Sequence, residues 1–130
     1  MRVPDISVLR FEALDFDPDN FDHEMHVYIA RALILEFGQE EAAERFAQTL
    51  KTLTDKLGMP GKYHETITRF YVHAIAERSR LSSAADWESF RTGHPELFDG
   101  SLLRSSYSAE RLASDEARRF FVLPDRSQVA

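Results

Sequence analysis

Apolar residues recur every three or four positions through the middle of the chain, which is the spacing of an amphipathic helix. The clearest stretch is residues 40–57, where one side of the predicted helix collects the following apolar residues: Ala43, Phe46, Ala47, Leu50, Leu53 and Leu57. The same spacing predicts helices over residues 21–37 and 63–81. Gly38 follows the first of them, as expected just past the end of a helix. Three long helices are therefore predicted.

The last third of the sequence predicts shorter elements. A capped helix is expected over residues 86–91, with new helical starts at Pro95 and after Ser108. No internal repeat, low-complexity tract or linker divides the chain. We therefore predict an all-α fold over residues 1–130, a compact single-domain helical bundle with three longer helices and two or three short ones.

The two ends of the chain lack helical periodicity. Residues 1–19 form an acidic leader that ends in a turn-prone Asp-Pro-Asp-Asn sequence, and we expect this leader to be irregular. The apolar residues 120–123 are expected to dock on the body of the protein. Residues 124–130 are polar, and we expect them to fray.

The helix predicted over residues 21–37 carries two apolar faces. His23 and His26 lie near the middle of one face, one turn apart, so both are expected to point inward. Tyr28 and Leu35 belong to the second face, with Met25 and Ala32. A helix that is apolar nearly all round is buried on both sides, either inside the fold or in an interface between subunits.

The helix predicted over residues 63–81 separates two neighbouring polar residues. His64 lies at the edge of the apolar stripe, whereas Glu65 lies almost opposite and can pair with Arg69 four residues on. His73 lies off the stripe and is expected to be exposed.

These positions suggest a ligand-binding pocket where the first and third long helices begin. Its predicted lining residues are His23, His26, His64, Tyr63 and Tyr71. Imidazole is the commonest metal ligand, so a divalent metal held by the three histidines, with Glu65 as a fourth ligand or general base, is one version of this site. In the alternative interpretation the histidines cap helix ends and bind backbone carbonyls.

A second hypothesis is a non-catalytic interaction module. The second apolar face of the helix over 21–37 would then form a homodimer, with Tyr28 and Leu35 as anchors. The sequence has no G-x-S-x-G elbow and no phosphate-binding glycine loop. Whether the protein is an enzyme stays open at this point.

Composition narrows the classes of partner. The chain of 130 residues has no cysteine, which excludes disulfides, thiolate zinc sites and cysteine nucleophiles. The net charge of −6 gives no basic excess for nucleic acid. No run of about 18 apolar residues occurs, so no membrane partner is expected and a cytoplasmic location is the default expectation.

Three blocks of sequence resemble a known family. The blocks are "FDHEMHV", then "YHETITRFY" after a glycine-rich break, then "YSAERLASDEARRFFVLPDR". Together they are similar to a family of small, conserved and uncharacterised bacterial proteins, and the resemblance runs from Phe21 to Arg126. "YHETIT" and "FVLPD" are its most specific parts; residues 28–34 depart from it, since similar proteins carry more large aromatics there. The resemblance implies a compact, mostly helical, cytoplasmic protein and assigns no catalytic residue.

Overall fold

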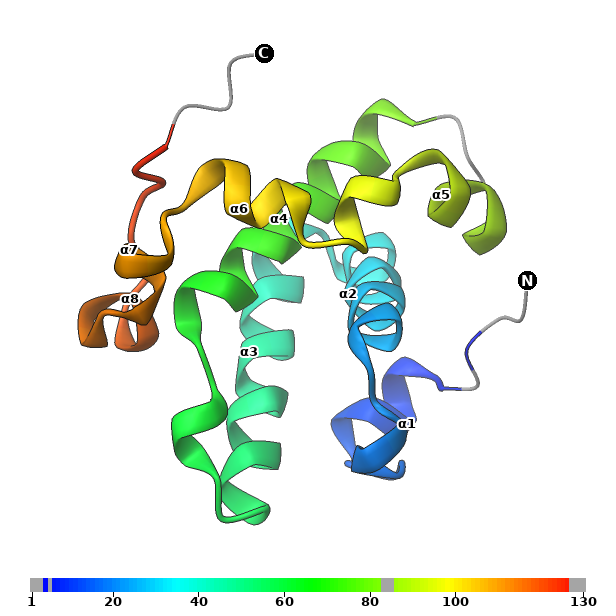
Figure 1. Ribbon diagram of the computed structural model, residues 1–130. Coiled ribbons are helices and arrows are strands. Elements are labelled where there is room, and N and C mark those ends of the chain that lie inside the picture. The colour runs from blue at the N-terminus through cyan, green and yellow to red at the C-terminus, as the bar shows by residue number, and fades with distance from the viewer. Residues whose placement is uncertain (1–3, 5, 83–85, 127–130) are drawn as a thin grey trace.

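Three long helices form the centre of the protein (Figure 1). The computed structural model describes residue 4 and residues 6–82 and 86–126, and this part of the chain is helical without any strand. The long helices are α2 (His23–Phe37), α3 (Gln39–Lys56) and α4 (Glu65–Leu81). The all-α fold class is confirmed, and each long helix begins and ends within two residues of its predicted bounds.

Helices α2 and α3 form an antiparallel hairpin (Figure 1). A single residue, Gly38, separates them, with φ 86° and ψ 166°. This combination is accessible essentially only to glycine, because a Cβ atom would clash with the backbone. The glycine predicted to follow the first helix thus makes the sharp reversal that places α3 beside α2.

Helix α4 packs against both members of this hairpin. The core between the three helices is built from their large apolar side chains, which are almost completely buried: Val27, Ile29, Leu33, Phe46, Phe70, Val72 and Ile75. Burial of each such side chain contributes roughly 1.5–3 kcal/mol, so this cluster is the main source of stability.

The acidic leader contains a short helix that was not predicted from the sequence. Helix α1 (Val8–Glu12) begins after Ser7, whose side chain accepts a hydrogen bond from the Arg10 N–H. Phe11 is fully buried and stacks on two phenylalanines of the core. A 3₁₀ turn, η1 (Pro18–Asn20), then leads to α2. The prediction of an irregular leader is therefore wrong here, because one deeply buried aromatic residue is enough to anchor a helix too short to show periodicity.

The C-terminal third contains more short helices than the two or three predicted. They are α5 (Trp87–Gly93), η3 (Pro95–Leu97), α6 (Ser101–Ser106), α7 (Ala109–Ala113) and α8 (Asp115–Arg119). The predicted final helix after Ser108 is split at Ser114, whose hydroxyl accepts from the Ala117 N–H and so starts α8. A serine that caps a new helix ends the previous one.

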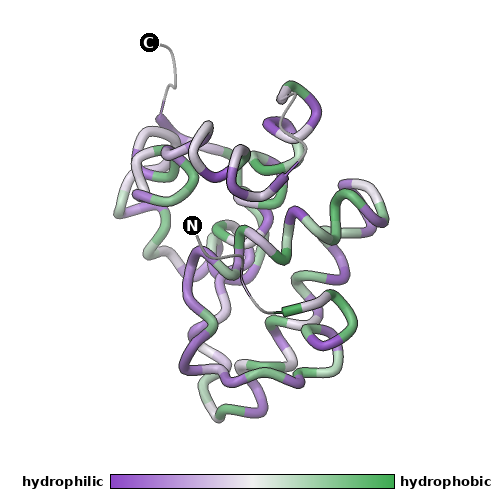
Figure 2. The backbone as a smooth tube through the Cα atoms, turned by 90° about the vertical axis from the view of Figure 1, so that its right-hand side faces the viewer, coloured by the Kyte–Doolittle hydropathy of each residue, from purple (hydrophilic) through white to green (hydrophobic). Residues whose placement is uncertain are grey.

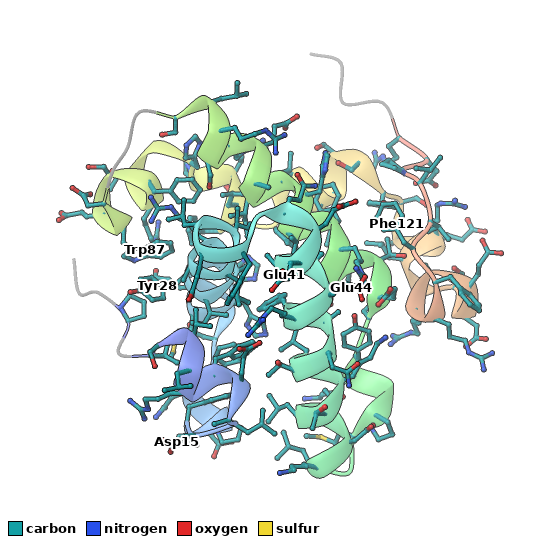
Figure 3. All side chains as sticks on the ribbon, turned by 180° about the vertical axis from the view of Figure 1, so that it is seen from behind. Asp15, Tyr28, Glu41, Glu44, Trp87 and Phe121 are labelled. Atoms are coloured by element: carbon teal, nitrogen blue, oxygen red, sulfur yellow. The ribbon has the colours of Figure 1, made fainter. Side chains whose placement is uncertain are left out.

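The segment after α8 docks only in part. Val122 is buried, but Phe120 is 65% exposed, and Phe121, at the edge of the molecule far from Trp87, is 46% exposed (Figure 3). Part of the predicted frayed tail is ordered, because the Asp125 carboxylate accepts hydrogen bonds from the backbone and side chain of Ser108. Residues 127–130 of that tail lie outside the described residues.

Hydrophobic and hydrophilic positions alternate along the helices (Figure 2). Among the described residues, no helix combines the length and the apolar character needed to cross a bilayer.

Candidate ligand-binding cavity

A cavity of about 770 Å³ lies among α2, α3 and α4. Its walls are mostly apolar, with these residues: Val27, Ala30, Phe46, Leu50, Leu53, Leu57, Ile67 and Ile75. All five residues predicted to bind a ligand also line it: His23, His26, Tyr63, His64 and Tyr71. The structure therefore brings the predicted set around one space, although the starts of α2 and α4 are about forty residues apart in the chain.

The cavity opens to solvent on the side where the chain enters α2 and leaves α3. Asp19 and Pro18 of η1 line this side. So do Met59, which precedes the turn η2 (Pro60–Lys62), and Lys62, the last residue of that turn. All four residues are exposed. One acidic and one basic side chain, Asp19 and Lys62, thus lie at the entrance. The other described lining residues include no aspartate, glutamate, lysine or arginine.

His23 begins α2 and is held through one ring nitrogen. Its Nε2 lies 2.7 Å from the backbone oxygen of Leu97. The ring meets Tyr71 edge to face, with centroids 4.9 Å apart. The bond to Leu97 connects α2 to η3. The other ring nitrogen, Nδ1, has no hydrogen bond to any described residue.

His26 is also held through one nitrogen, in this case by its own helix. Its Nδ1 lies 2.7 Å from the backbone oxygen of Asp22, and its ring centroid lies 4.2 Å from that of Phe21. Burial lowers the pKa of His26, assisted by the neighbouring His23, although the bond to Asp22 works in the opposite direction. His26 is therefore neutral at pH 7, with Nε2 left over.

His64 differs, because both of its ring nitrogens are engaged. Nδ1 accepts a hydrogen bond from the Ile67 N–H at 3.1 Å, so His64 is the N-cap of α4. Nε2 lies 2.8 Å from the backbone oxygen of Leu112 in α7. A carbonyl can only accept, so Nε2 carries the proton and Nδ1 is the bare acceptor that the cap requires. His64 thus joins α4 to the C-terminal third.

Tyr63 and Glu65 belong to a charged network beside the cavity. The Tyr63 hydroxyl donates to Glu65 Oε1 at 2.6 Å, and Arg69 Nε donates to Glu65 Oε2 at 3.1 Å. Burial and the adjacent Glu65 carboxylate raise the pKa of Tyr63, so the phenol stays protonated. The predicted Glu65–Arg69 pair is confirmed.

The Tyr71 hydroxyl differs from that of Tyr63, because it is not hydrogen-bonded to a described residue. The side chain is buried, and burial raises the pKa of the phenol. Its oxygen forms no hydrogen bond to any described residue, yet it is not among the described polar atoms that are sealed from solvent. Tyr71 itself is one of the residues that line the cavity.

The structure does not assemble the predicted metal site. The three histidines are bonded to three different backbone carbonyls, and Glu65 is engaged by Tyr63 and Arg69. Within the described ranges, no group of three or more histidine, aspartate or glutamate side chains could hold a metal ion. His23, His26 and His64 line one cavity and Glu65 lies beside it, but the four side chains do not share a coordination point, because each one is bonded to its own backbone or ionic partner.

The second apolar face of α2 is partly covered. Tyr28 packs edge to face on Trp87 of α5, with centroids 5.0 Å apart (Figure 3), whereas Leu35 remains 62% exposed. One of the two anchors predicted for a homodimer is therefore already packed within the molecule. His73 is exposed, as predicted.

The sequence did not predict that apolar residues form most of the cavity wall. Phe46, Leu50 and Leu53 belong to the stripe that predicts α3, and periodicity assigns such residues to a closed core. It carries no signal for whether the facing helices meet or leave a gap. Met59 and Lys62, at the entrance, lie in a break that the sequence marks only as a turn.

Comparisons of the chain with protein-family models, with curated proteins and with solved structures found no match.

Proposed function

We propose that this protein binds a small, largely apolar molecule in the cavity among α2, α3 and α4. The observation that carries the proposal is the cavity itself, about 770 Å³ in volume with leucine, isoleucine and phenylalanine walls. Binding sites for small molecules span roughly 300–1,000 Å³ and combine apolar walls with a few polar groups. The two histidines of α2 and Tyr71 are such groups.

The energetics favour an apolar occupant. Each Å² of apolar surface removed from water contributes about 25 cal/mol, and this gain applies to both the walls and the ligand. Water in a space lined by Leu50, Leu53 and Ile67 has few partners for hydrogen bonds, so its displacement costs little.

Binding without chemistry is the better-supported activity. Nucleophilic catalysis needs a hydroxyl or thiol within hydrogen-bond reach of a base. Among the described cavity residues, the hydroxyls of Thr54 and Thr68 instead donate to the backbone oxygens of Lys51 and His64. Neither threonine is paired with a histidine ring.

Uptake of an uncharged fluorescent probe tests the proposal. N-phenyl-1-naphthylamine should gain fluorescence with the wild-type protein, because its rings leave water for the cavity. Leu53→Trp fills the cavity from α3, since Leu53 is a half-buried wall residue, and should weaken binding at least about tenfold.

The matched control is Leu81→Trp, which places the same large side chain on an 83% exposed position at the end of α4. It should bind the probe as the wild type does, and circular dichroism should show that both variants are folded. Equal binding by Leu53→Trp and the wild type would place the probe elsewhere and refute the proposal.

A further inference from the structure

The two histidines of α2 have defined tautomers. A backbone oxygen carries no hydrogen, so a ring nitrogen bonded to it must be the protonated one. His23 is bonded to Leu97 through Nε2, and His26 is bonded to Asp22 through Nδ1. In a neutral imidazole the second nitrogen is then bare. Both rings line the cavity and keep one bare nitrogen as a hydrogen-bond acceptor, Nδ1 in His23 and Nε2 in His26.

Three polar side chains meet on this wall. The His23 ring lies 6.5 Å from the His26 ring and 4.9 Å from the Tyr71 ring, measured between centroids. Tyr71 lines the same cavity, and its hydroxyl, which is not hydrogen-bonded to a described residue, can donate one hydrogen bond. The wall combines two acceptors with one group that both donates and accepts.

We propose that the ligand carries an uncharged hydroxyl group on an apolar body, and that this hydroxyl donates to a bare imidazole nitrogen of His26 or His23 and accepts from Tyr71. The inference rests on the proposed binding function and names the class of ligand for the same site. A hydroxyl matches the wall because it has one hydrogen to donate and lone pairs to accept.

Other head groups fit less well. A carboxylate only accepts, so it would face two acceptor nitrogens unless an imidazole took up a proton. Burial opposes this for His26, whose pKa is lowered. An ether can use the Tyr71 hydroxyl but leaves the bare nitrogen of the half-buried His26 unpaired, and an acceptor shielded from water without a donor is unfavourable.

Three naphthalene derivatives separate these cases by competition against N-phenyl-1-naphthylamine at pH 8, where imidazole groups are neutral. The probes are 2-naphthol, 2-methoxynaphthalene and 2-naphthoate, which share one ring system and differ in the head group. We expect 2-naphthol to bind about 3- to 10-fold more tightly than the ether, the range for one hydrogen bond, and more tightly still than the carboxylate.

Substitutions of the two histidines test whether they cause the preference for the hydroxyl probe. His26→Phe keeps a ring against Phe21 but removes the acceptor, and His23→Phe does the same beside Tyr71. The double variant should bind 2-naphthol and 2-methoxynaphthalene with similar affinity while still taking up N-phenyl-1-naphthylamine. If His26→Phe does not fold, His23→Phe and Tyr71→Phe should each reduce the ratio of the two affinities.

The outcomes distinguish the two proposals. Equal affinities of the three probes for the wild type, or a preference for the hydroxyl that the double variant retains, would overturn the hydroxyl inference and leave the binding function standing. Failure of the wild type to bind N-phenyl-1-naphthylamine or any naphthalene probe would refute the binding function, and the inference with it.

Discussion

The starts of α4 and α2 use histidine in contrasting ways, although both line the same cavity. At the start of α4, both nitrogens of His64 are bonded, one to its own helix and one to α7. At the start of α2, His23 and His26 each keep one nitrogen without a described partner. Complete pairing marks a side chain that joins parts of the fold, whereas a leftover acceptor on a cavity wall is free to meet a ligand. The contrast predicts stability effects at one start and binding effects at the other.

The start of α4 is joined to the C-terminal third through Thr66 as well. Thr66 is fully buried, and its hydroxyl lies 2.7 Å from the Ala117 oxygen and 2.9 Å from the Phe120 oxygen. The same oxygen accepts from the Val122 N–H at 3.1 Å. One hydroxyl therefore shares its hydrogen between two backbone oxygens and accepts from one N–H, which joins α4 to α8 and to the segment after α8.

Thr66→Val should give the largest loss of stability among the changes considered. The substitution keeps the shape but leaves a buried N–H and two carbonyl oxygens unpaired, and such groups cost about 1–3 kcal/mol each when nothing relaxes. We expect the free energy of unfolding in urea to fall by about 2–4 kcal/mol. Thr52→Val is the control, because the Thr52 hydroxyl donates to the Gln48 oxygen one turn earlier in the same helix. A loss at Thr66 no larger than at Thr52 would contradict the assignment.

Substitutions of His64 should have the next largest effect. His64→Ala removes the N-cap of α4 and the bond to Leu112, and we expect a loss of about 1–2 kcal/mol in the same urea measurement. Asparagine is a favoured N-cap residue, so His64→Asn should recover part of the loss that comes from the cap.

Ligand binding sharpens this second prediction. Because both nitrogens of His64 are occupied, His64→Asn should leave the affinity for 2-naphthol relative to its methyl ether unchanged. Loss of that preference would show that His64 belongs with His23 and His26, and the contrast between the two helix starts would fail.

Much of this fold could be predicted because its signals are local. The three long helices follow from apolar spacing, and the reversal at Gly38 follows from a backbone conformation that favours glycine. Helix α1 could not be predicted in the same way. It has five residues and is held by Phe11, whose partner Phe21 lies between η1 and α2 and whose partner Phe46 lies in α3.

For the candidate site, the sequence predicted which histidines lie together but not what they bond to. A helical wheel places His23, His26 and His64 toward the interior. The structure puts all three around one cavity, but His23 is exposed and only His26 and His64 are half-buried. The choice between metal ligand and hydrogen-bonded residue depends on the oxygens of Leu97 and Leu112. These backbone atoms are supplied by segments whose positions only the tertiary fold determines, so no spacing in the sequence reports them.

The pH dependence of stability should show the smallest effect, and it isolates His26. The pKa of His26 in the folded protein is lowered, chiefly by burial, below the value of about 6.5 for imidazole in the unfolded chain. As the pH falls, the unfolded chain takes up this proton first. The contribution of neutral His26 to stability is therefore complete above about pH 6.5 and is lost as the pH falls from there through the folded pKa, by about 1.4 kcal/mol for each pKa unit of difference.

Nuclear magnetic resonance of the histidine ring protons can measure this titration directly. We expect the His26 signals to titrate below pH 6.5, and Phe21→Leu, which removes the ring 4.2 Å away, to move the midpoint back toward that value. The pH dependence of the unfolding free energy should also be shallower in His26→Phe than in the wild type between pH 7.5 and 5, because the substitution removes the proton uptake that is linked to unfolding. A His26 midpoint above 6.5 would contradict the predicted effect of burial, and one above 8 would mean that the imidazole is charged in the binding experiment. The ring would then donate from both nitrogens, and the wall would select an anion instead of a hydroxyl.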